Sequence, residues 1–258
     1  MTIPLEDRAL TPWITLSFHP FVSHSMKSTR SLRSLLGSTI SLIVLLSLTT
    51  PAAAARWKVL FDGSSTEAFR QFKQDGFPKR GWEVVDGTLH VKAGGGAGDL
   101  VTKEQFGDFE LEFEWKVAPG ANSGVMYRVS EDLKEPWQTG PEYQVLDDSR
   151  HGDGRNPKTS ASALYALVAA NPKKALKQVG EWNKARIVVR GWSVQHWLNG
   201  KKVVSIDLAS PEARALIAQS KFSGYPKFAR EPIGHLCFQD HGDDVWFRKI
   251  RVRSLDSK

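Results

Sequence analysis

Cysteine is nearly absent from this sequence: Cys237 is the only one in 258 residues, so no disulfide can form within one molecule. Its apolar neighbours Leu236 and Phe238 favour a buried structural thiol over a nucleophile. The sequence also lacks His-Glu-x-x-His, paired Cys-x-x-Cys and Gly-x-Ser-x-Gly motifs. Glycine-rich residues 94–98 have neither phosphate-binding spacing nor a helical pattern after them, which indicates a turn. Nucleophilic serine or cysteine catalysis and phosphate-loop binding therefore have no support.

A strong excess of one charge is missing as well. The chain has 35 Lys and Arg against 28 Asp and Glu, a formal net charge of +7. No block of basic residues concentrates this modest excess, so a solvated surface explains it better than a nucleic-acid partner.

The sequence also lacks an apolar run long enough to span a bilayer. The apolar run at residues 35–48 is shorter than the roughly 20 residues that a span requires. Basic residues precede this run and small residues follow it, as in a secretory signal cleaved near Ala55. We therefore expect residues 1–55 to be a removed signal rather than a retained anchor, with no stable membrane span afterwards and a periplasmic or extracellular product. Because the signal looks complete from Met26, we expect translation to start there.

What is present from residue 56 onward is a series of short strand patterns. Asp86-Gly87 and Asn199-Gly200 predict the turns of two β-hairpins, over residues 82–91 and 193–204. Further strands are expected at residues 109–117, 124–129, 142–146, 162–167, 185–190, 233–238 and 245–252. Only residues 211–220 have a helical pattern. Roughly eleven strands without βαβ alternation predict a single all-β domain over residues 56–258, an antiparallel β-sandwich or jelly roll.

Polar and ionisable side chains concentrate in residues 140–167. Glu142 and Gln144 are expected on one face of a strand, about 7 Å apart. The loop that follows carries His151 and Lys158 among several aspartates, which suits the rim of an active site or, equally, a solvated surface loop.

Other polar residues fall on neighbouring strand patterns. Arg128 is expected to share a face with Met126, and His241 with Gln239 if their strand runs that far. Paired as in a jelly roll, these strands would bring Arg128, Glu142, Gln144, Gln239 and His241 onto one concave sheet. Arg128 could equally form a surface ion pair, and His241 could be a strand-end polar residue. Trp137, in a loop beside Pro136, could lie against a sugar face.

The assembled pattern over residues 57–255 resembles the 3-keto-disaccharide hydrolase domain family. The segments that carry the resemblance are residues 59–63 (VLFDG), 82–89 (WEVVDGTL), 109–115 (FELEFEW), 122–125 (NSGV), 142–147 (EYQVLD), 182–183 (WN), 196–200 (HWLNG), 239–241 (QDH) and 245–250 (VWFRKI). The resemblance implies a concanavalin A-like jelly roll, export, and action on glycosides oxidised to a ketone at C3.

In such a reaction the ketone acidifies the hydrogen on C2, so a base can remove it and the C1 substituent leaves by β-elimination; water then adds back. This chemistry needs a general base and a donor or cation at the developing oxyanion, a role that a divalent metal also fills. The expected metal ligands are Glu142 and His241, and the expected catalytic residues are Glu142 as base, His151 as acid or base, and Arg128 and Lys158 at the oxyanion. The expected substrate-binding residues are Asn122, Gln144, Trp137 and Gln239.

Two other functions stay open. A conventional glycosidase would need two carboxylates about 5 to 9 Å apart. Two residues after Glu142 the sequence has Gln144, an amide, so a second carboxylate would have to come from another strand. A non-catalytic, lectin-like carbohydrate-binding module would suit a jelly roll, with Asp and Asn side chains serving a calcium ion.

Overall fold

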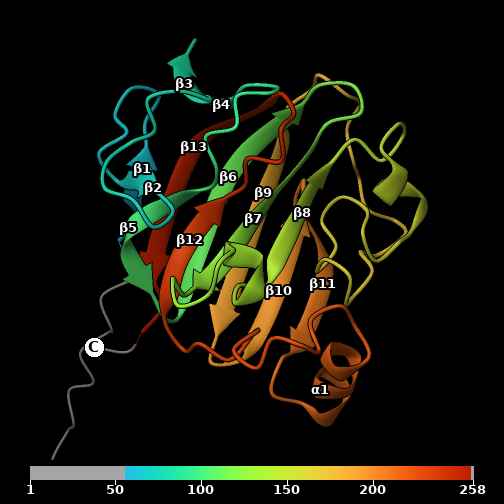
Figure 1. Cartoon of the computed structure of the whole chain (residues 1–258). Helices are drawn as coiled ribbons and strands as arrows, with labels where there is room; N and C mark the ends of the chain where they lie inside the picture. Colours follow the sequence, from blue (N-terminus) through green and yellow to red (C-terminus); the bar gives the residue numbers. More distant parts are fainter. Residues whose placement is uncertain (1–55, 257–258) are drawn as a thin grey trace, which may run out of the picture. The chain divides into compact units, whose positions relative to one another are not determined.

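Residues 56–256 are described by the computed structural model, and they form two antiparallel β-sheets with one α-helix (Figure 1). The expected signal segment, residues 1–55 with Met26, lies outside the described residues. One sheet has the strand order β11-β10-β9-β6-β13-β4-β3, with β1 paired to β13; the other has the order β2-β5-β12-β7-β8. The strands are β1 (Lys58–Phe61), β2 (Phe69–Gln71), β3 (Trp82–Val85), β4 (Thr88–Val91), β5 (Leu100–Phe106), β6 (Phe109–Val117), β7 (Asn122–Val129), β8 (Glu142–Leu146), β9 (Asn183–Arg190), β10 (Ser193–Leu198), β11 (Lys201–Asp207), β12 (Gly234–Phe238) and β13 (Val245–Ser254). The predicted β-sandwich is confirmed.

Aromatic side chains fill the space between the sheets. Phe113 of the eight-stranded sheet makes edge-to-face contacts with Tyr143 and Phe238 of the five-stranded sheet, at ring-centroid distances of 5.7 and 6.1 Å. Phe113 and Tyr143 each stand between two polar neighbours in their strands, so their rings point to the inner face. Removing one such buried ring costs about 3 to 5 kcal/mol, and these contacts fix the two sheets relative to each other.

Both predicted hairpin turns form. Asp86 and Gly87 have φ values of 47° and 69°, and Asn199 and Gly200 have 47° and 82°. Two successive residues with positive φ are the requirement of the type I′ turn, which matches the twist of the strands it joins.

The strand expected at residues 162–167 is wrong. Ser162 and Ala166 have positive φ values of 68° and 59°, which break an extended run into tight turns. This segment still lies along the free edge of β8, because Ser162 N donates to Gln144 O and Tyr165 N donates to Glu142 O. It thereby closes one side of the five-stranded sheet.

The helix α1 (Pro211–Ala218) confirms the predicted helical segment and begins at a Ser210 cap whose hydroxyl accepts from Ala213 N. Two short 3₁₀ helices, η1 (Pro136–Gln138) and η2 (Gly152–Arg155), lie in the loops before and after β8. Within residues 56–256, no helix has the length and apolar character needed to cross a membrane.

One line of register partners crosses the five-stranded sheet from Val101 through Cys237 and Met126 to Glu142. Antiparallel partners point to the same face, so Glu142 shares its face with an apolar strip that also contacts Trp137. Cys237 is fully buried in this strip, as predicted for a structural thiol, and burial raises its pKa well above the usual value.

Candidate active site

A small polar cavity of about 160 Å³ lies on this face of the five-stranded sheet. Its walls come from β7, η1, β8 and three connecting segments, and the lining residues are Asn122, Trp137, Glu142, Gln144, Tyr165, Lys221, Gln239 and His241. Six of these eight were candidates from sequence: Asn122, Trp137, Glu142, Gln144, Gln239 and His241. The cavity is smaller than the roughly 300 to 1,000 Å³ of drug-sized ligand sites, so it suits one sugar ring.

Glu142 lies at the floor of the cavity and is only 7% exposed. Its carboxyl folds over Gly124 of the neighbouring strand, where a Cβ would overlap Oε1 and lie 2.7 Å from the carboxyl carbon. Burial is the main cause that raises the pKa of Glu142, to about 8; Lys221 opposes the rise and Asp99 and Asp153 add to it. The carboxyl is therefore mostly protonated at neutral pH in the free protein, and it becomes a strong base once ionised.

A chain of amides connects the cavity wall to His241. Gln144 Nε2 donates to Asn122 Oδ1 at 3.1 Å, and Asn122 Nδ2 lies 3.4 Å from Nε2 of His241. This contact makes Nε2 the acceptor, so the proton of the neutral imidazole is on Nδ1. Gln144 Oε1 is buried and has no hydrogen-bond partner among residues 56–256. An unpaired buried oxygen beside the cavity is suited to accept from a ligand hydroxyl or to bind a cation.

His151 does not line the cavity itself but lies beside its lining residue His241. Its Nδ1 accepts from Asp153 N at the start of η2, at 3.1 Å, and its ring centroid lies 6.4 Å from that of His241. Because Nδ1 is the acceptor, Nε2 carries the proton of the neutral ring and is available to a ligand above the cavity.

Lys158 and Arg128 do not line the cavity. Lys158 is exposed, and its backbone is tied within its own loop to Asn156 Oδ1 and Ala166 N. The expectation that Arg128 shares a face with Met126 is wrong, because Arg128 has a φ of 52° and strand alternation ends there. Its guanidinium instead donates to Gly107 O at 2.9 Å and to Asp108 at 3.1 Å.

Lys221 also lines the cavity, and no pattern in the sequence indicates this, because the residue lies on an irregular segment after α1 without a recognisable motif. Tyr165 was expected in a strand, and instead its ring lines the cavity while its hydroxyl donates to Asp153 Oδ2 at 3.2 Å. A further carboxyl, Asp99, accepts from Asp240 N at 2.8 Å. Burial is the main cause that raises the pKa of Asp99, to about 7.

Three side chains at the cavity carry atoms that can coordinate a metal ion. Glu142 and His241 line the same cavity, and Gln144 Oε1 is a third donor without a partner. Nowhere in residues 56–256 does a group of three or more His, Cys, Asp and Glu side chains stand ready for an ion. An ion at the cavity would be held by one carboxylate, one imidazole and one amide oxygen, with water completing its shell, and His241 Nε2 would first have to release Asn122 Nδ2.

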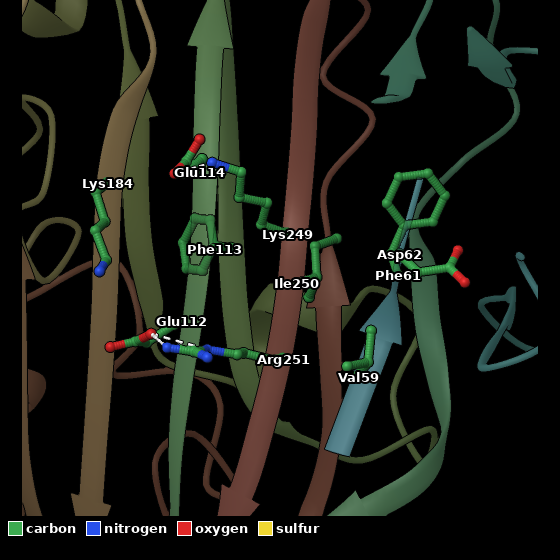
Figure 2. A pocket seen from close by; sticks show the side chains of 10 residues that line it. All are labelled: Val59, Phe61, Asp62, Glu112, Phe113, Glu114, Lys184, Lys249, Ile250 and Arg251. Carbon is green, nitrogen blue, oxygen red and sulfur yellow. Dashed lines mark hydrogen bonds and ion pairs between the residues drawn. The ribbon is translucent and has the colours of Figure 1, made fainter. Parts of the chain in front are cut away.

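Three larger hollows are found elsewhere among the described residues. Figure 2 shows a hollow of about 480 Å³ on the eight-stranded sheet, beside β1. There Arg251 pairs with Glu112 at 2.5 Å and Lys249 with Glu114 at 3.0 Å. These cross-strand ion pairs stabilise the sheet.

Comparisons with known proteins agree with this fold. A family model described as "3-keto-alpha-glucoside-1,2-lyase-like domain" matches residues 56–253. A 3-keto-disaccharide hydrolase of Bacteroides thetaiotaomicron is 37% identical over 241 residues, covering 81% of this chain and 82% of that protein. The crystal structure of a "putative glycosyl hydrolase" from Parabacteroides distasonis superposes with a TM-score of 0.71 at 30% identity, covering 78% of this chain and 94% of that one. A second structure described in the same words and from the same organism has a TM-score of 0.62 at 31% identity, over 78% of this chain and 100% of that one.

Proposed function

The chain belongs to the 3-keto-alpha-glucoside-1,2-lyase-like domain family, and from this premise we propose that it cleaves glycosides already oxidised to a ketone at C3. The coarser statement, a carbohydrate-active hydrolase, rests on the family and on the 3-keto-disaccharide hydrolase that resembles it. The observation that carries the finer proposal is the buried Glu142 carboxyl, with a pKa of about 8, at the floor of a cavity sized for one sugar ring.

The proposed reaction begins when ionised Glu142 takes the proton from C2. The electrons of the C–H bond form an enolate whose negative charge rests on the C3 oxygen. Re-formation of the C3 carbonyl then creates the C1–C2 double bond as the bond from C1 to the glycosidic oxygen breaks. The leaving oxygen takes a proton from the acid at the rim, for which His151 Nε2 is available. Water adds to C1 and a proton returns to C2, so the net reaction is hydrolysis.

The remaining polar groups of the cavity bind and orient the sugar. Gln144 Oε1 accepts from a ring hydroxyl, which gives this buried oxygen the partner it lacks in the protein. Gln239 and Asn122 lie on the same wall, and Trp137 offers an aromatic surface to the apolar face of the ring. Together they hold C2 against Glu142, and this positioning raises the rate without further chemistry.

A divalent metal ion is part of the proposal. One oxygen of Glu142, His241 Nε2 after release from Asn122, and Gln144 Oε1 in place of its contact with the ring hydroxyl would hold it. When bound it would supply a Lewis acid to the ketone, and the second oxygen of Glu142 would remain free as the base. Purified protein treated with a chelator should lose activity, and added divalent ions should restore it. Unchanged turnover after complete removal of metal, checked by elemental analysis, would contradict this part of the proposal alone.

The deciding experiment compares a 3-keto-glucoside with the matching unoxidised glucoside, using residues 56–258. Release of the aglycone from the keto compound alone supports the proposal. A conventional glycosidase is the second candidate, and it would need a second carboxyl near Glu142; the nearby carboxyls whose charges act on Glu142 are Asp99 and Asp153. It predicts cleavage of the unoxidised glucoside. Binding of sugar without cleavage of either compound would indicate a lectin-like module.

We also propose that the protein acts outside the cytoplasm, on the basis of the signal pattern before residue 56. The pattern of basic residues, apolar run and small residues predicts a mature protein that begins near Arg56. Expression of the full chain in a bacterial host, fractionation and N-terminal sequencing would test this. An unprocessed chain in the cytoplasmic fraction would contradict it.

A further inference from the structure

Lys221 places its ammonium group against the aromatic wall of the cavity. Its Nζ lies 4.3 Å from the ring centre of Tyr165, 5.2 Å from that of Phe222 and 5.3 Å from that of Trp137. Although the residue as a whole is exposed, these rings restrict its end group to the side of the cavity. Attraction between a cation and aromatic faces contributes to holding it there.

The aromatic wall is itself fixed by contacts outside the cavity. Trp137 packs edge-to-face on Tyr225 with a centroid distance of 5.1 Å, and the Tyr165 hydroxyl is bound to Asp153. The Lys221 ammonium is therefore positioned before a ligand arrives, which lowers the cost of orienting a flexible side chain during reaction.

Electrostatics connect Lys221 to the proposed base. Burial lowers the pKa of Lys221, while Glu142 and Asp153 oppose this effect. In turn, Lys221 is the main influence that opposes the rise in the pKa of Glu142. In the part of the chain that the structure describes, Lys221, Glu142 and Asp153 have no ion-pair partner. The charge of Lys221 is therefore not neutralised by direct contact.

Other cations considered for the oxyanion are committed elsewhere or distant from the cavity. Arg128 is bound to Asp108, and Lys158 is exposed and does not line the cavity. Among the described residues that line the cavity, Lys221 is the one lysine or arginine.

We propose that Lys221 is a catalytic residue whose ammonium donates to the C3 oxygen and stabilises the negative charge formed when the C2 proton leaves. The proposal rests on the proposed function, because it requires a ketone at C3. The step is balanced: the C2–H electron pair moves into the C2–C3 bond, the carbonyl pair moves onto oxygen, and the proton goes to Glu142. Lys221 keeps its proton and forms no covalent bond.

The test separates enolate formation from bond cleavage. A 3-keto sugar with hydrogen in place of the C1 substituent has no leaving group, so exchange of its C2 hydrogen for deuterium in D₂O reports enolate formation alone. Lys221→Met should slow this exchange, and kcat on the 3-keto-glucoside, by roughly 100- to 1,000-fold, as for removal of one oxyanion donor. Lys221→Arg should recover part of the loss because it keeps the charge. Lys201→Met, at an exposed lysine of β11 outside the cavity, is the matched control and should change neither rate.

Each outcome decides the proposal. If the wild type cleaves the keto compound and Lys221→Met exchanges and cleaves at the wild-type rate, the role of Lys221 is overturned while the proposed function stands. If Lys221→Met is slow in cleavage but normal in exchange, Lys221 does not act on the enolate and the proposal is also overturned. If borohydride traps a covalent adduct on Lys221, the lysine forms an imine with the ketone, and its proposed role as an ammonium donor is overturned. If the wild type does not cleave the keto compound, both proposals are overturned. Matched unfolding midpoints of the variants establish that losses of rate are not losses of fold.

Discussion

The carboxyl of Glu142 lies in the space that a side chain at Gly124 would occupy. A Cβ at Gly124 would overlap Glu142 Oε1, and the φ of this glycine is not in the left-handed region. The position therefore requires glycine for space rather than for backbone conformation.

Gly124→Ala should displace the Glu142 carboxyl and lower kcat/KM on a 3-keto-glucoside by roughly 100-fold, because a misplacement of about 1 Å has an effect of this size. The fold should remain, since alanine fits the backbone of a strand and the carboxyl is the end of a flexible side chain. Steady-state kinetics and thermal unfolding would be measured on the same preparation. Full activity in this variant would show that the observed placement of Glu142 is not the reactive one.

The pH dependence of activity should follow the ionisation of Glu142. A base works only when deprotonated, and the pKa of Glu142 is raised to about 8, so kcat/KM should rise with pH through about 8. Glu142→Gln should remove about 1,000-fold of the rate at pH 8 and above, as expected for loss of a general base, and the difference from the wild type should shrink as the pH falls. A rate that falls through the same range would assign Glu142 as an acid instead.

Glu142 should also lower the stability of the folded protein at neutral pH. The pKa of Glu142 is about 8 in the folded protein, above the ordinary value of 4.5. Between pH 4.5 and pH 8 the folded state therefore keeps a proton on this carboxyl, while the unfolded state has released it. Stability contributed by this group is complete below pH 4.5 and is lost as the pH rises toward 8. Glu142→Gln should therefore be more stable than the wild type at pH 7, by on the order of 2 to 3 kcal/mol.

Urea unfolding at pH 5 and pH 7 would test this effect. The difference in unfolding free energy between Glu142→Gln and the wild type should be larger at pH 7. An equal difference at both values would mean that the carboxyl is not desolvated in the folded protein.

Arg128 should contribute to stability and not to the reaction. Its guanidinium is buried against Gly107 O and Asp108, and burial lowers its pKa. Arg128→Met should cost roughly 1 to 3 kcal/mol because a buried carbonyl and a carboxylate lose their donor. The kcat and KM of the folded fraction should equal those of the wild type, measured well below the unfolding midpoint. A loss of kcat without a loss of stability would show that Arg128 takes part in the reaction.

The local features of the fold were predictable because their physical causes are local. Asp86-Gly87 and Asn199-Gly200 tolerate the positive φ values of type I′ turns, and the alternation of residues 109–117 matches a half-buried strand. Glu142 and Gln144 were expected on one face, and both line the cavity because β8 is regular throughout.

The errors arose where the backbone leaves regular structure. Arg128 was placed by alternation, which fails at a residue with positive φ. Ser162 interrupts an apparently extended segment in the same way. Lys221 reaches the cavity only because the segment after α1 folds back over the sheet, an event set by tertiary packing with no periodic signal in the sequence.

The single cysteine allows local opening of the five-stranded sheet to be measured. Cys237 is fully buried, and its register partner Met126 pairs in turn with Glu142. A thiol reagent can reach Cys237 only when the five-stranded sheet separates from the segments that cover it. The labelling rate under native conditions therefore measures how often the floor of the cavity becomes exposed to solvent, and a bound sugar should slow that rate by protecting the closed state.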